Sequence, residues 1–293
     1  MPRIVPLATL ATGLLAASAC SVTRVNRAAM VPHMTPTLRA GAPFEAPAEL
    51  SVGASSVAHT TLGASDASAA VEIPGTQAEV AARLRITPNV GLGILYARGF
   101  GATSEPIKNN QPPIDGDVAG GGISVNGVIP TSDPRWHVGI NAEFLVWNIP
   151  YVEYETCIEN CGPVPWSGVE HGDSSIGQVA LGIVPTYDGG SWRAWGGVTA
   201  RNHPTIEQKG TELGVDVEDE VEAGSFNAVV SAGLDLDLGG GIRAGATLYQ
   251  VVRGAPASYG PSLAATLTVP LGARSNKARQ LANSGAAVGT GGL

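Results

Sequence analysis

The chain has 293 residues and a net charge of −8, and 14% of its residues are charged, against about a quarter in ordinary soluble domains. Its 17 Lys and Arg residues are nowhere concentrated, which excludes the basic surface of a nucleic-acid-binding protein. The length suits one large β domain or two small ones.

The first residues, MPRIVPLATLATGLLAASAC, contain one Arg, an apolar run and small residues before a cysteine. This pattern predicts a secretory signal peptide over residues 1–19, because the apolar run is too short to span a membrane. The ending 17-ASAC-20 resembles the bacterial lipobox, although Ala17 replaces the usual Leu. The resemblance implies a lipid on Cys20 and, with Ser21 after it, transfer to the outer membrane. Ordinary cleavage after Ala19, which would leave Cys20 as a thiol, is the alternative.

Residues 20–47 are predicted to be a lipid-anchored linker, because residues 21–46 have three prolines and no sustained period. In such a linker His33 and Met34 are expected to be solvated rather than to bind a soft metal. Residues 273–293 are rich in Gly, Ala and Ser and are predicted to form a flexible tail.

Between these ends, successive runs alternate apolar and polar residues with the period of a β-strand. The ten runs cover residues 48–59, 76–86, 90–98, 118–129, 136–147, 175–184, 192–201, 226–238, 242–252 and 261–271.

The connections between these runs are alternately short and long. Residues 87–89, 130–135, 185–191 and 239–241 contain the Gly, Pro, Asn and Asp of tight turns, whereas 60–75, 99–117, 148–174, 202–224 and 253–260 are mostly longer. Short periplasmic turns and longer external loops are typical of outer-membrane barrels. An even number of strands would place both termini on the short-turn side.

The two faces of the predicted strands differ in charge. The apolar face carries no charged residue until Arg98, at the loop end of its run, whereas the other face carries the remaining charges. An arginine facing lipid at the membrane midplane costs about 2–4 kcal/mol, so the uncharged face is predicted to contact lipid. A soluble barrel with its apolar face inward is the rival, but its outer face should be rich in Lys and Glu. No predicted strand contains a lysine.

Over residues 48–272 the chain therefore resembles bacterial outer-membrane β-barrels in architecture. The predicted fold is all-β, an up-and-down antiparallel transmembrane barrel of about ten strands. Such barrels commonly end in a strand with a terminal aromatic residue, whereas here the last run ends 269-VPL-271. Aromatic residues on the outward face are predicted to form the two girdles at the membrane interfaces. These are Trp136 and Trp192 at the short-turn end, and Tyr96, Phe144 and Phe226 near the long loops.

Charged residues on the inward face are predicted to pair across the lumen as a plug, because buried charges persist only when paired. They are Arg83, Arg85, His137, Glu143, Arg193, Asp235, Asp237 and Arg243. A selectivity filter in a small pore is the alternative. The plug is favoured because barrels of eight to ten strands are largely filled by their own side chains.

Cys157 and Cys161 are predicted to form a disulfide in an exported chain, and a zinc site is the weaker alternative because no His ligands lie nearby. No common catalytic motif occurs. Some ten-stranded barrels are proteases with Asp and His at the external rim, and by that resemblance Asp173, His171 and His203 are the candidates here.

The predicted protein is a non-enzymatic outer-membrane barrel with a structural, ligand-binding or adhesive role carried by its external loops. Its partners are outer-membrane lipid and an extracellular ligand or surface, and no cofactor or metal is expected. The alternatives are a narrow passive pore, an outer-membrane hydrolase, and a lipid-tethered periplasmic protein with a soluble β domain.

Overall fold

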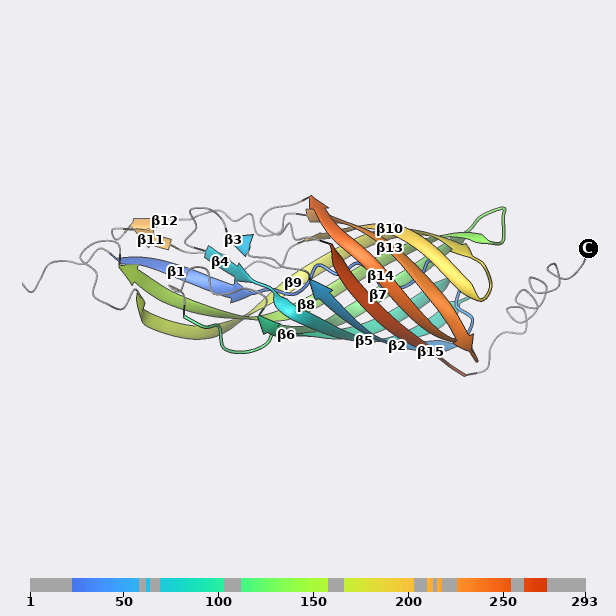
Figure 1. Cartoon of the computed structure of the whole chain (residues 1–293), viewed down its shortest axis with the longest axis horizontal. Coiled ribbons are helices and arrows are strands. Elements are labelled where there is room, and N and C mark those ends of the chain that lie inside the picture. The colour runs from blue at the N-terminus through green and yellow to red at the C-terminus, as the bar shows by residue number, and fades with distance from the viewer. Residues whose placement is uncertain are drawn as a thin grey trace, which may run out of the picture.

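The protein, seen here as a computed structural model, forms a closed antiparallel barrel of ten strands (Figure 1). The structure describes residues 23–57, 62–63, 69–102, 112–157, 166–202, 210–212, 215–217, 226–253 and 261–272. The wall strands are β2 (Ala48–Val57), β5 (Pro74–Thr87), β6 (Val90–Ala102), β7 (Ala119–Pro130), β8 (Trp136–Cys157), β9 (Trp166–Asp188), β10 (Trp192–Asn202), β13 (Phe226–Gly239), β14 (Ile242–Arg253) and β15 (Ser262–Leu271).

Each wall strand pairs with its neighbours along the chain, and the ring closes where β15 pairs with β2 from Ser262↔Val57 to Leu271↔Ala48. The predicted all-β, up-and-down barrel is confirmed. In the described part of the chain no helix is long and apolar enough to cross a membrane.

The outer surface of the barrel is apolar around its whole circumference. On β6, for example, Leu92, Ile94 and Tyr96 are 48%, 64% and 52% exposed, whereas the intervening Leu95 is 8% exposed. The same alternation leaves Leu84, Ile123, Leu181, Leu236 and Leu263 exposed on other strands. Soluble monomeric proteins rarely expose an apolar surface of this extent, whereas a barrel that spans a bilayer must present one to the hydrocarbon. The uncharged face therefore contacts lipid, as predicted, and the soluble alternative does not fit this exterior.

Replacing Ile94 by Arg tests this orientation. Ile94 lies near the middle of the membrane-facing part of β6, so the substitution is expected to destabilise the folded barrel by about 2–4 kcal/mol. The matched variant Ile86→Arg, next to the short turn, should cost only about 0–1 kcal/mol because the interface is wetter. Urea unfolding in detergent or lipid measures both, and equal costs would contradict a lipid-facing surface.

Two wall strands are much longer than predicted. β8 and β9 pair from Trp136↔Tyr187 to Thr156↔Trp166, so most of the predicted loop 148–174 is a hairpin that continues the wall beyond the barrel. The loop prediction was wrong there because it weighted Pro150 and the glycines, whereas Val152 and Tyr154 extend the apolar alternation and are buried. β9 also extends through Tyr187 into the predicted turn 185–191.

This projection forms a small sheet with the N-terminal strand β1 (Thr23–Met30), which pairs antiparallel with β8 from Thr23↔Cys157 to Ala29↔Tyr151. We call β1, residues 149–157 of β8 and residues 166–174 of β9 the external sheet. Its far edge is lined by β4 (Ala69–Glu72), parallel to β1, and by β11 (Gly210–Glu212). The short β3 (Leu62–Gly63) and β12 (Val215–Val217) pair with these two strands, and the whole group lies beyond one end of the barrel in Figure 1.

After β1 the chain enters the barrel and crosses it. Residues 31–47, which we call the lumen segment, run down the inside of the barrel and lead directly into β2 at the short-turn end. Val31, His33, Met34, Ala42 and Ala46 are all 0% exposed, so the expectation of a solvated linker is wrong for this stretch. The first described residue, Thr23, pairs with Cys157 at the long-loop end, whereas the even strand count predicted that the chain would approach the barrel from the short-turn side.

Candidate functional site: the filled lumen

The lumen segment meets an apolar core at the long-loop end of the barrel. Val31 and Met34 pack in one cluster with the inward side chains of Leu145, Trp147 and Tyr249. These inward residues lie on strands whose opposite parity faces lipid, so the period of two that builds the exterior also places them inside. The long-loop end of the lumen is therefore filled by apolar side chains.

His33 fixes the segment at this level by its polar atoms. Its backbone N–H donates to Oε1 of Gln77 at 2.9 Å, and its ring Nδ1 lies 2.9 Å from Oγ of Ser55. Its Nε2 lies 2.5 Å from the carbonyl oxygen of Pro74. Both ring nitrogens thus have protein partners, which explains how a fully buried histidine is tolerated and leaves no free lone pair for a metal.

A buried ion pair occupies the middle of the lumen. Arg201 donates to Oε2 of Glu143, and the two side chains are only 3% and 7% exposed. The second carboxylate oxygen of Glu143 accepts a hydrogen bond from Oγ1 of Thr37 in the lumen segment at 2.7 Å. Arg201 also donates to Oε1 of Gln178 at 3.1 Å, and Trp147 donates to the same oxygen at 2.9 Å. The segment is therefore part of a polar network that joins β8, β9 and β10.

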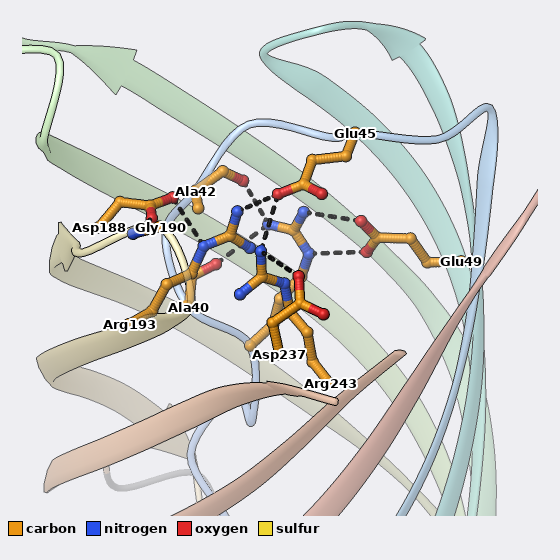
Figure 2. A network of polar contacts seen from close by, with 10 residues as sticks. Ala40, Ala42, Glu45, Glu49, Asp188, Gly190, Arg193, Asp237 and Arg243 are labelled. Atoms are coloured by element: carbon orange, nitrogen blue, oxygen red, sulfur yellow. Dashed lines mark hydrogen bonds and ion pairs between the residues drawn. The ribbon is translucent and has the colours of Figure 1, made fainter. Parts of the chain in front are cut away.

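Below this network, Arg39 of the lumen segment is held in a fixed position. Its Nε and Nη2 donate to the two oxygens of Glu49 at 3.1 and 3.4 Å, and its Nη1 donates to the carbonyls of Ala40 and Ala42. These three partners are labelled in Figure 2. Its guanidinium carbon lies 4.0 Å from the ring centroid of Phe44. A forked ion pair and a stacked ring are the contacts that an arginine makes and a lysine does not.

Glu45 then binds two arginines of the barrel wall at the short-turn end. Its Oε1 accepts hydrogen bonds from Arg193 of β10 and from Arg243 of β14, the latter at 2.9 Å (Figure 2). Arg193 also donates to Asp188 at 2.8 Å, and Arg243 lies 3.8 Å from an oxygen of Asp237. One carboxylate of the segment therefore bridges two separate strands, and Asp188 and Asp237 supply further negative charge to the same two arginines.

Glycines allow the segment to pass close to the wall. A Cβ on Gly41 would lie 2.3 Å from the carbonyl oxygen of Val184 and 2.4 Å from the nitrogen of Gly139, so any side chain there would overlap the backbone of the wall. Gly41 instead donates its N–H to Oγ1 of Thr186 at 2.8 Å. The ring of Phe44 fills the space that a Cβ on Gly91 would need, at 2.2 Å.

The predicted lumen charges are only partly brought together. Arg193, Arg243 and Asp237 meet through Glu45 and Asp188, and Asp235 lines a recess beside them. Glu143 lies higher and pairs with Arg201, while Arg83 donates to Oγ of Ser51 at 2.9 Å. The backbone N–H of Arg85 donates to Pro47, and His137 is half-buried opposite Thr186.

Sequence reasoning missed the residues that tie this network together, namely Thr37, Arg39, Glu45 and Asp188. Three of them lie in the predicted linker and the fourth in a predicted turn. One signal was present, because residues 28–46 contain only two charged residues, Arg39 and Glu45, whereas a solvated linker is normally rich in polar and charged residues.

The aromatic residues expected in the girdles all lie exposed on the outer face. Trp136 and Trp192 are 48% and 39% exposed, and Tyr187 lies between them with ring centroids 5.3 and 5.4 Å away. Tyr187 was missed because it was assigned to a turn. Tyr96, Phe144 and Phe226 are 52%, 49% and 56% exposed on strands nearer the long-loop end.

The candidate catalytic residues do not form a described catalytic pair. His171 and Asp173 lie two residues apart on one exposed face of β9, and Nδ1 of His171 is 3.7 Å from a carboxylate oxygen of Asp115. His203, Cys20, Cys161, the side chain of Cys157, the predicted signal peptide and residues 273–293 lie outside the described residues.

No protein-family model and no curated protein matches this chain. Among solved structures, it is similar to LpxR from Salmonella typhimurium, with a TM-score of 0.40 and 6% identity over 76% of this chain and 100% of that one. The β domain of the Bordetella autotransporter BrkA gives 0.40 and 11%, over 78% and 100% of the two chains. The outer membrane protease OmpT from Escherichia coli gives 0.32 and 7%, over 86% and 94%.

TM-scores of 0.40 and below transfer no property to this chain. Its own closed hydrogen-bond ladder and apolar exterior are what a bilayer requires of a spanning β protein. The chain has the architecture of a bacterial outer-membrane β-barrel.

Proposed function

We propose that this protein is a non-enzymatic outer-membrane barrel that is closed to solutes and holds the external sheet at the cell surface as a binding or adhesion surface. The observation that carries the proposal is the occupied lumen. Apolar packing fills its upper part, and the ion pairs of Arg39 and Glu45 bind its lower part to the wall. A barrel whose lumen is filled in this way can hold a structure at the cell surface but offers solutes no path through it.

The external sheet is a rigid base for recognition. Val152 and Tyr154 are buried beneath it, and Arg27 of β1 forms an ion pair with Glu153 of β8 at 2.6 Å. Among the described side chains that are exposed on it or beside it, the carboxylates are Glu170, Asp173 and Asp115, and His171 lies beside Asp115. Exposed groups on a rigid scaffold are where binding usually resides, and this charge favours a cationic partner.

Planar-bilayer recordings of the purified full chain test closure first, and no discrete ion conductance is expected. The two buried ion-pair layers should keep the lumen closed at moderate voltage. Discrete conductance steps would instead support the second candidate, a narrow passive pore, whose motivation is the charged recess between Arg39, Arg193 and Glu49.

Binding is tested with the protein in lipid nanodiscs against arrays of cationic, neutral and acidic peptides. In the matched variant, Glu170→Gln, Asp173→Asn and Asp115→Asn remove the exposed acidic charges and leave the paired hairpin in place. The full chain is expected to retain cationic peptides and the uncharged variant to lose them, while both still migrate faster in SDS before boiling. Equal peptide binding by the two proteins would refute a role for these acidic groups.

A further inference from the structure

The contacts of the lumen segment descend through the barrel in strict order. His33 touches residues at the long-loop ends of β2 and β5, and Thr37 contacts Glu143 at mid-height. Phe44 then donates its N–H to the carbonyl oxygen of Pro88, in the short turn between β5 and β6. The carbonyl of Pro47 accepts the N–H of Arg85 beside the same turn. The segment therefore crosses the full height of the barrel once.

β1, the strand that precedes the lumen segment, lies beyond the long-loop end of the barrel, away from the membrane. β1 pairs with the part of β8 that lies beyond the barrel, and its first described residue, Thr23, is opposite Cys157. Trp147 lies in the apolar cluster at the long-loop end of the barrel. Cys157 lies about 33 Å further along β8, at about 3.3 Å per residue. In outer-membrane barrels the long connections face outward and the short turns face the periplasm.

We propose that the N-terminus of the exported protein lies on the external side of the outer membrane, so that the lumen segment is an additional membrane crossing inside the barrel. Cys20 is three residues from Thr23, a distance that extended chain covers in about 10 Å. The predicted lipid-attachment residue is therefore on the external side too. A lipid on Cys20 would extend from the tip of the external sheet, and not into the periplasmic leaflet where a lipid-anchored linker would place it.

The inference uses the outer-membrane placement but not the binding role proposed above. Its test leaves peptide binding and conductance untouched, so the two proposals fail separately. It also does not require that Cys20 carry lipid, because the pairing of β1 with β8 alone places Thr23.

Epitope tags on intact cells provide the test. One variant carries a short tag immediately before Thr23, a second carries it in the long connection between β6 and β7, and a third carries it in the short turn 131–135. Antibody added to intact cells is expected to bind the first two tags and to reach the third only after the outer membrane is permeabilised. Faster migration in SDS before boiling verifies that each tagged barrel is folded.

A folded variant whose tag before Thr23 is reached only after permeabilisation would overturn the proposal. Should the tag prevent β1 from pairing, trypsin offers a second measurement on the untagged chain. Arg24 and Arg27 of an external β1 should be cut on intact cells once an Asn-Gly turn replaces residues 154–169, because this removes part of the strand with which β1 pairs. Cleavage there only in permeabilised cells would also overturn it.

Discussion

Replacing Gly41 by Val is expected to keep the lumen segment out of the barrel as it assembles, so that the barrel conducts ions. The new side chain would overlap the backbone of Val184 and Gly139, and neither strand can move away because each is hydrogen-bonded on both sides within the ring. Overpacking of this kind usually costs about 1–3 kcal/mol, and an overlap with backbone cannot be relieved by a rotamer change. Assembly of the barrel without the segment inside is the available relief.

Two measurements test whether the lumen segment is outside the barrel. Discrete conductance steps should appear in planar bilayers, and trypsin should cut after Arg39, which is enclosed in the folded protein. Gly177→Ala is the matched control, because its added Cβ would meet nothing nearer than 3.8 Å. If the Gly41 variant is folded and cut by trypsin at Arg39 but silent in the bilayer, then the lumen segment is not what closes the barrel. A folded variant that is silent and resistant to trypsin would contradict the predicted exclusion of the segment.

Replacing Glu143 by Leu is expected to lower the free energy of unfolding by about 3–5 kcal/mol, because Arg201 would be left as a buried charge without its carboxylate. Thr37 would lose its acceptor as well, so the segment should loosen at mid-height. The measurement is urea unfolding in detergent. The fraction of folded protein is read from its faster migration in SDS than that of the unfolded protein.

Two further variants separate the contributions at this position. Thr37→Val removes only the hydrogen bond from the segment and should cost about 1 kcal/mol. The double variant Glu143→Leu with Arg201→Met removes both charges and should recover most of the lost stability, since an apolar pair leaves no ion unpaired. If the double variant is as unstable as Glu143→Leu alone, the loss arises from packing and not from the charge.

The barrel wall could be predicted from the sequence because lipid imposes a regular rule on it. Each strand must place an uncharged side chain outward at every second residue, and residues such as Ile94 and Leu236 therefore mark their strands and faces directly. The turns were predicted for a related reason, since a reversal of two neighbouring strands needs the positive φ of a residue such as Gly240.

The lumen segment could not be predicted because it has no period. Its residues satisfy their polar groups one at a time with side chains far away in the chain, as Glu45 does with Arg193 and Arg243. Such partners are determined by the closed barrel and not by local sequence. The external hairpin was missed for a local reason, because Pro150 and Gly172 interrupt the alternation that continues on either side.

The lumen segment has a consequence for how the protein is assembled. It ends at residue 47, and the very next residue, Ala48, begins the strand that seals the ring against β15. A chain that is held at both ends, by β1 outside and by β2 in the wall, cannot enter a finished cylinder. Either the seam between the first and last wall strands forms around the segment, or the segment is threaded through the lumen before β1 pairs with β8. In both orders the segment is locked in place once the two pairings exist, because it cannot leave the lumen without breaking one of them.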